Sequence, residues 1–265
     1  MAKNPSDREP DKHYGGRGDP VRSMALLWRD GATPARGRGP KPGLTVDRIV
    51  ASAIELADAE GLAALSMRRV AERLGVGTMS LYTYVPSKAE LVDVMYDTVC
   101  GEVARTAVDG GWRSRLEAIA RANWDLYRRH PWMLRVMAMS RPPLGPNSIA
   151  GYDHDLRAVD GIGLSELEMD SVVSLVSVFV QGAARTAVEA ASSARDTGVT
   201  DEEWWSTYGP LLEKVFDAKK YPVAARVGAV AGEVYQSAYD PAHGFQFGLA
   251  RLLDGIEVLI ESRHQ

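Results

Sequence analysis

Short polar side chains gather between Ser66 and Lys88, and their types and spacing suit contact with nucleic acid. Hydroxyl and methyl groups of this size can meet base edges in a major groove, where a methyl can lie against the methyl of thymine. Phenolic hydroxyls and cations can reach phosphate oxygens. The candidate DNA-binding residues in this stretch are Ser66, Arg68, Thr78, Met79, Ser80, Tyr82, Thr83, Tyr84 and Lys88.

Two short helices joined by a sharp turn are predicted to hold these side chains. Apolar residues recur at helical spacing from Met67 to Leu74, and Ser66 stands at the N-cap position. Gly75 follows at once, where a helix end favours a residue that tolerates positive φ. A second helix over residues 78–84 then turns polar side chains outward, as in a helix-turn-helix. Any two short helices joined by Gly-Val-Gly give this local pattern, so the flanking sequence has to decide.

A longer helix is predicted on each side of this pair. Thr45 caps an apolar stripe that runs from Val46 to Ala57, and Ser87-Lys88-Ala89-Glu90 is a capping box that opens the next helix. The order is therefore long, short, short, long within about sixty residues. It predicts an N-terminal three-helix bundle that contains the helix-turn-helix, followed by a connecting helix.

Residues 51–76 and 81–91 closely resemble the DNA-binding domain of TetR-family transcriptional regulators. The most specific part is the Leu-Tyr-x-Tyr/His-Val/Phe-x-x-Lys-x-x-Leu ending, which reads here Leu-Tyr-Thr-Tyr-Val-Pro-Ser-Lys-Ala-Glu-Leu. Pro131-Trp132 and residues 245–256 look like the tetracycline-repressor-type regulatory domain. The resemblance implies an all-α protein in which the three-helix bundle joins a helical regulatory and dimerisation domain.

We expect three parts along the chain of 265 residues. Residues 1–44 form a flexible basic arm, residues 45–100 form the DNA-binding domain with its connecting helix, and residues 101–265 form the ligand-binding and dimerisation domain. The net charge is −4, yet the arm carries nine Lys and Arg against five Asp and Glu. A basic N-terminal end and an acidic remainder fit a DNA module at the N-terminus.

The arm is rich in proline and glycine and lacks periodicity, which predicts disorder. Residues 21–28 are the exception, because they can form a short amphipathic helix that docks on a partner surface. Arg36 and Arg38 alternate with glycine, and extended Arg-Gly-Arg segments can lie in a narrow minor groove. A flexible, solvated tail is the alternative.

The chain after Trp112 is helical throughout by period, with no alternating strand pattern. Its last helix and a long helix through Gly182 are expected to form a two-fold dimer interface. Two recognition helices must reach successive major grooves roughly 34–36 Å apart, which favours a dimer. Packing of the apolar stripe inside one subunit is the alternative. The candidate interface residues are Ala183, Ala184, Leu249, Leu252, Leu253 and Ile256.

Large or polarisable side chains on successive helices are the candidate effector-binding residues, since the resemblance implies a cavity in the regulatory domain. The asparagine, histidine, glutamine and arginine among them would supply its polar groups. The alternative is that the aromatic and methionine side chains are ordinary core residues. The candidates are Asn123, Trp124, Tyr127, Trp132, Met137, Tyr152, His154, Phe179, Gln181 and Arg185.

No catalytic site, metal site or cofactor is predicted. The sequence has no Gly-x-Ser-x-Gly, no phosphate-binding glycine loop and no His-Glu-x-x-His. Its five histidines are scattered, and the single cysteine, Cys100, excludes an intramolecular disulfide. The apolar patch from Val172 to Val180 is short and interrupted by serine, so we expect no membrane span and a cytoplasmic protein.

These features predict a bacterial, dimeric, DNA-binding transcriptional regulator that is not an enzyme. Its expected partners are double-stranded DNA with a palindromic operator, a second copy of the chain, and a small-molecule effector that releases a repressor. The helix from Ser87 to Val99 is the expected hinge between operator and effector binding. The alternative is an effector-independent architectural DNA-binding dimer.

Overall fold

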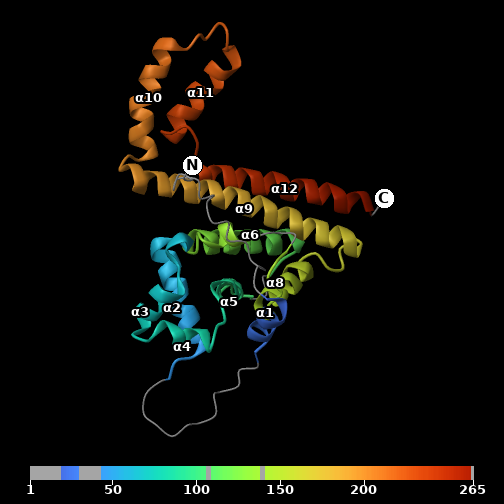
Figure 1. The fold of residues 1–265 in the computed structure, drawn as a ribbon. Helices are drawn as coiled ribbons and strands as arrows, with labels where there is room; N and C mark the ends of the chain where they lie inside the picture. Colours follow the sequence, from blue (N-terminus) through green and yellow to red (C-terminus); the bar gives the residue numbers. More distant parts are fainter. Residues whose placement is uncertain (1–18, 30–42, 106–108, 138–140, 264–265) are drawn as a thin grey trace, which may run out of the picture. The chain divides into compact units, whose positions relative to one another are not determined.

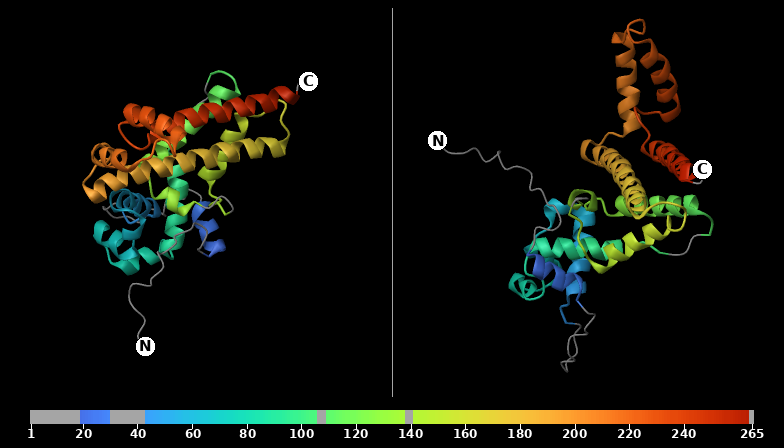
Figure 2. Two further views of the ribbon diagram at one scale, coloured as in Figure 1. Left: turned by 90° about the horizontal axis from the view of Figure 1, so that it is seen from above. Right: turned by 90° about the vertical axis from the view of Figure 1, so that its right-hand side faces the viewer.

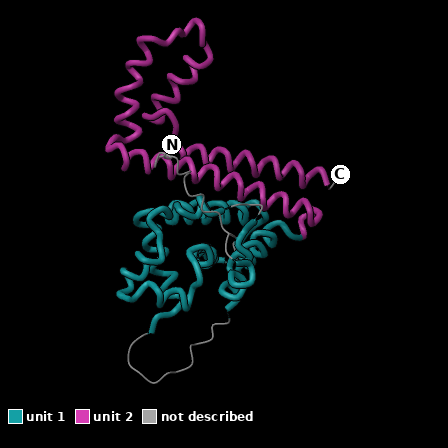
Figure 3. The backbone as a smooth tube through the Cα atoms, viewed as in Figure 1, with its two compact units in different colours: residues 1–160 teal, residues 161–265 magenta. Residues whose placement is uncertain are grey.

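The computed structural model describes residues 19–29, 43–105, 109–137 and 141–263. Within these ranges every regular element is a helix, which confirms the all-α prediction. The chain divides into two compact units, residues 1–160 and residues 161–265 (Figure 3). The helices labelled in Figure 1, with the 3-10 turn η1 and helix α7, are α1 (Pro20–Leu27), α2 (Val46–Glu60), η1 (Leu62–Ala64), α3 (Met67–Leu74), α4 (Thr78–Tyr82), α5 (Lys88–Cys100), α6 (Trp112–Arg129), α7 (Met133–Val136), α8 (Pro146–Arg157), α9 (Glu166–Thr197), α10 (Asp201–Val215), α11 (Pro222–Tyr235) and α12 (Pro241–Arg263).

Helices α2, α3 and α4 form the predicted three-helix bundle, and α5 packs against α2. Helix α3 begins after Ser66, whose hydroxyl accepts a hydrogen bond from the Arg69 amide, and ends at Gly75, which adopts a left-handed φ of 69°. Val70 of α3 and Leu81 of α4 are fully buried. The cap and the glycine read from the sequence therefore set both ends of α3.

Helix α5 is the hub of the first unit. Nine of its thirteen residues are buried, and α1, α2, α7 and α8 pack against it. The Ser148 amide and hydroxyl donate to Asp97 Oδ1 at 2.8 and 2.9 Å, so a carboxylate of α5 lies at the N-terminus of α8. Helix α2 of the DNA-binding bundle and α8 are thus both placed against α5.

Helix α1 packs on the chain's own α5. The Ser23 hydroxyl donates to Asp93 Oδ2 at 3.0 Å, and the Asp19 amide donates to Glu90 Oε1 at 3.0 Å. Leu27 is only 6% exposed. The predicted amphipathic helix is present and packs on α5 of its own chain, while its docking on a partner surface stays a prediction. This part of the expected flexible arm is therefore structured.

The second unit contains α9 to α12. Figures 1 and 2 show α9 and α12 running side by side. They approach closely at Gly248, where an added Cβ would lie 2.5 Å from a ring atom of Phe179. Helix α10 continues through Pro210. No residue of α11 is buried. Its valines recur at helical spacing and form an exposed apolar stripe of Val223, Val227, Val230 and Val234.

Helix α9 is the one helix of the described ranges that is long and apolar enough to cross a membrane, judged by length and composition alone. Its most apolar window of 18 residues has a mean hydropathy of 1.4. The apolar patch was expected to end at Val180, but the alanines beyond Gln181 extend it further along α9. The core helix of a folded domain meets the same criterion, and five residues of α9 are buried in the folded chain.

Replacing Leu27 with alanine is expected to destabilise the chain by about 2 kcal/mol, because it leaves a cavity between α1 and α5. The matched control is Met24→Ala on the same helix, since Met24 is 43% exposed and should change stability by no more than about 0.5 kcal/mol. Urea unfolding of both variants measures the difference. Equal effects would show that α1 is not packed on α5.

Candidate nucleic-acid interface

The side chain of Leu81 determines which face of α4 meets solvent. Helix α4 has only five residues, and Leu81 is fully buried while Met79 is 77% exposed. The other predicted contacts of this turn lie outward as well, apart from Thr78, which is half-buried. The exposed predicted contacts, besides Met79, are Ser80, Tyr82, Thr83 and Tyr84.

The remaining DNA-binding candidates of this stretch flank α4. The Ser66 hydroxyl is used as the N-cap of α3. Arg68 Nε donates to Glu72 Oε1 at 2.8 Å, and both side chains are largely exposed. Exposed ion pairs of this kind are weak, so Arg68 can exchange Glu72 for a phosphate. Lys88 is the half-buried first residue of α5.

Two arginines that the sequence analysis did not single out tie α3 to α2. Arg69 Nη2 lies 2.6 Å from Glu60 Oε1, and Arg73 Nη2 lies 2.9 Å from Glu55 Oε2. The partners are distant in sequence and lie on different helices, so no local pattern predicts them. Both pairs are exposed and connect only α3 to α2, and α3 in turn packs against α4.

Arg36 and Arg38 lie outside the described residues, so their minor-groove contact stays a prediction. These two arginines belong to residues 30–42. On the N-terminal side of that segment, Arg29 Nη2 lies 2.5 Å from Asp47 Oδ1 on α2. On its C-terminal side, Gly43 leads directly into the Thr45 cap of α2. Both borders of residues 30–42 therefore belong to the DNA-binding part of the chain.

The candidate effector-binding residues are divided between the two units. In the first unit Trp124, Tyr127 and Trp132 are buried, and burial raises the pKa of the Tyr127 hydroxyl. Their grouping around one cavity stays a prediction. The others of the first unit are Asn123, Met137 and His154, which are half-buried, and Tyr152, which is exposed. Those of the second unit are Phe179 and Gln181, which are half-buried, and Arg185, which is exposed.

The dimer candidates lie along α9 and α12. Leu249, Leu253 and Ile256 are buried, as is Ala184. For these four residues, the structure therefore fits the alternative given above, in which the apolar stripe packs inside one subunit. Leu252 is half-buried and lines a groove of about 360 Å³ between α9 and α12. The half-buried residues Leu252 and Ala183 are thus the predicted interface residues that remain partly accessible.

Two family models match the chain. The model described as "Bacterial regulatory proteins, tetR family" matches residues 49–95, and the model described as "Tetracyclin repressor-like, C-terminal domain" matches residues 106–260. The chain belongs to the TetR family. The transcriptional repressor DrrR1 of Streptomyces coeruleorubidus is 47% identical over 250 residues, which cover 94% of this chain and 89% of DrrR1.

Two crystal structures of ActR, a TetR-family protein of Streptomyces coelicolor, are similar to this chain. The complex with (S)-DNPA has a TM-score of 0.66 and 30% identity, over 81% of this chain and 98% of ActR. The complex with actinorhodin has a TM-score of 0.66 and 30% identity, over 82% of this chain and 99% of ActR. This TetR-family chain is a DNA-binding transcription regulator, and α3 and α4 lie within the region that the N-terminal model matches.

Tyr82→Phe is expected to weaken operator binding by about 1 kcal/mol or more, because it removes one hydroxyl that can donate to a phosphate. Titration of the purified protein with its operator measures the loss. Tyr208→Phe on α10 is the control, since Tyr208 is similarly exposed but lies outside the DNA-binding domain. Unchanged affinity of Tyr82→Phe would remove this hydroxyl from the contacts.

Proposed function

We propose that this TetR-family chain is a homodimeric repressor that holds a palindromic operator through two copies of α4 and is released by a small molecule. The exposed polar surface of α4, set by the buried Leu81, is the observation that supports DNA reading. Two copies related by a two-fold axis present two such surfaces. A palindrome with half-sites roughly 34–36 Å apart matches that symmetry.

The contacts to DNA divide by chemistry. Thr78, Met79 and Ser80, at the start of α4, reach base edges with hydroxyl and methyl groups. Tyr82 and Tyr84 donate hydroxyls to phosphates, and the cationic candidates on either side neutralise phosphate charge. Base contacts then specify the sequence, whereas phosphate contacts fix the register of the protein on the duplex.

An apolar outer face of α9 and α12 supports the homodimer. Leu175, Val178 and Val258 are 51%, 54% and 66% exposed, and Leu175 and Leu252 line the groove between the two helices. Exposed apolar patches mark interaction sites, and a second copy covers this one by placing its own α9 and α12 against it. The apolar composition of α9 then serves the dimer, in keeping with a cytoplasmic protein.

Release by a small molecule is supported by the likeness to ActR, whose structures hold (S)-DNPA and actinorhodin. We assign the predicted aromatic and polar candidates on α6 and α8 to such a ligand. The ligand weakens operator binding only by as much as it prefers a second arrangement of the dimer. Helix α5, which packs against both α2 and α8, is the element that connects the two sites.

Selection of binding sites from random duplex DNA, near physiological salt, tests the function. The proposal predicts a palindrome with half-sites about one helical turn apart. Recovery of no sequence above non-specific binding would contradict it. With the operator in hand, affinity is measured with and without actinorhodin and a panel of small molecules. Insensitivity to all of them would favour the effector-independent architectural dimer.

Replacing Arg36 and Arg38 with alanine is expected to lower the salt slope of operator binding by roughly two, because each arginine neutralises a phosphate. The matched control replaces Arg195 and Arg226, two exposed arginines of the second unit. Operator affinity over a range of salt concentrations gives both slopes. If the slope of the arm variant equals that of the control, the arm does not touch DNA.

A further inference from the structure

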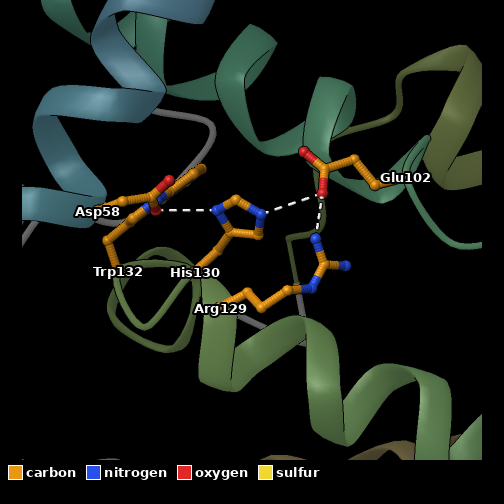
Figure 4. Close-up of polar contacts among 5 residues, drawn as sticks. All are labelled: Asp58, Glu102, Arg129, His130 and Trp132. Atoms are coloured by element: carbon orange, nitrogen blue, oxygen red, sulfur yellow. Dashed lines mark hydrogen bonds and ion pairs between the residues drawn. The ribbon is translucent and has the colours of Figure 1, made fainter.

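A buried histidine joins three elements of the first unit. His130 directly follows α6 and is 7% exposed. Its Nδ1 lies 2.8 Å from Asp58 Oδ1, on the last turn of α2, and its Nε2 lies 3.1 Å from Glu102 Oε2, just beyond α5. Figure 4 shows the imidazole between the two carboxylates. We name His130, Asp58 and Glu102, together with Arg129 and Trp132, the latch.

Each carboxylate of the latch receives a second donor from the same short segment. Trp132 Nε1 donates to Asp58 Oδ1 at 2.8 Å, and Arg129 Nη1 donates to Glu102 Oε2 at 2.7 Å. Side chains from residues 129–132 therefore hold two carboxylates that come from α2 and from the end of α5. With His130 protonated, the two negative charges are balanced by two positive ones, as partly buried charges require.

The protonation state of His130 determines how many of these bonds form. Both ring nitrogens face acceptors, and only the doubly protonated imidazole can donate to both. Burial lowers the pKa of His130, but the hydrogen bonds and charges of Asp58 and Glu102 outweigh burial and raise the pKa above its ordinary value. The stability that protonated His130 gives to the folded chain is therefore complete below a pH of about 6.5, and it is lost as the pH rises through the raised pKa of His130.

The latch lies where the DNA-binding helices attach to α6. Asp58 belongs to α2, α3 packs against α2, and α4 packs against α3. On the other side, α6 carries Trp124 and Tyr127, two candidate effector-binding residues, shortly before His130. A ligand that displaces this end of α6 must carry the imidazole away from Asp58 or Glu102.

We propose that the latch is a proton-linked positioning device that, when closed, holds α2 and with it α4 in the placement that binds the operator. The inference rests on the proposed function. His130 acts through α2 and is a positioning residue. An effector that moves α6 opens the latch and shifts the population away from the operator-binding state.

The test is operator affinity at constant ionic strength from about pH 6 to about pH 8.5, in wild type and in His130→Gln. The wild type is expected to lose about tenfold in affinity over this range, the fold-change typical of losing a hydrogen bond to a charged group. The glutamine amide carries no titrating proton. His130→Gln should therefore bind more weakly than wild type near pH 6 and show a flat profile.

Two further variants separate the latch from general effects. His243→Gln alters an exposed histidine of α12 and should keep the wild-type profile. Asp58→Asn keeps an acceptor for Trp132 but removes one of the two charges beside His130, so it should reduce the pH dependence while Glu102 still faces the ring. Parallel profiles for wild type and His130→Gln, or affinity that increases with pH, would overturn the proposal.

Hydrogen exchange of the DNA-free protein gives a readout that does not need the operator. Near pH 6.5, amides of the last turn of α2 are expected to exchange about tenfold faster in His130→Gln than in wild type. Equal exchange in the two proteins overturns the latch. A wild type that selects no operator but shows this exchange difference contradicts the proposed function alone. An operator bound with parallel pH profiles contradicts the latch alone.

Discussion

The burial of one side chain, Leu81, is the contact on which the DNA-binding surface depends. A helix of five residues is too short to be stable in isolation, because helix nucleation is unfavourable. Helix α4 therefore exists because Leu81 anchors it in the three-helix bundle, and that anchor also fixes its rotation. With Leu81 pointing inward, Met79 and the neighbouring hydroxyls point outward. One apolar contact thus provides both the stability and the orientation of the polar face.

The placement of this surface depends on polar contacts that reach the bundle from outside it. Helix α5 carries buried carboxylates that meet α1 and the start of α8, among them Asp93 and Asp97. The latch adds a second attachment, from α6 to the end of α2. A buried carboxylate needs its donors, so a change in the angle between these helices breaks at least one favourable contact. Helices that are joined through buried carboxylates therefore change between discrete arrangements, and a regulated DNA-binding protein requires such a change.

The sequence predicted what local chemistry determines. The cap at Ser66 and the glycine at Gly75 gave the helix-turn-helix, and the structure confirms those helix ends. Contacts between distant residues left no such signal. His130 looked like one of several scattered histidines because Asp58 is 72 residues away, and the docking of α1 on α5 likewise joins residues about 70 apart. Helix α11 fits the helical period expected after Trp112, but the sequence could not show that its valine stripe stays exposed in the folded chain.

Directed cleavage of the operator from α4 tests the central claim, that this turn enters the major groove. A Met79→Cys variant carries an iron chelate on an exposed thiol. Burial raises the pKa of the Cys100 thiol, the single native one, to about 11, so it reacts slowly at neutral pH. The account predicts two cleavage clusters, related by the operator's two-fold axis and roughly 34–36 Å apart. The control is Val234→Cys, which carries the same chelate at an exposed position of α11. If the Met79→Cys variant cleaves the operator no more strongly than this control, the account is contradicted.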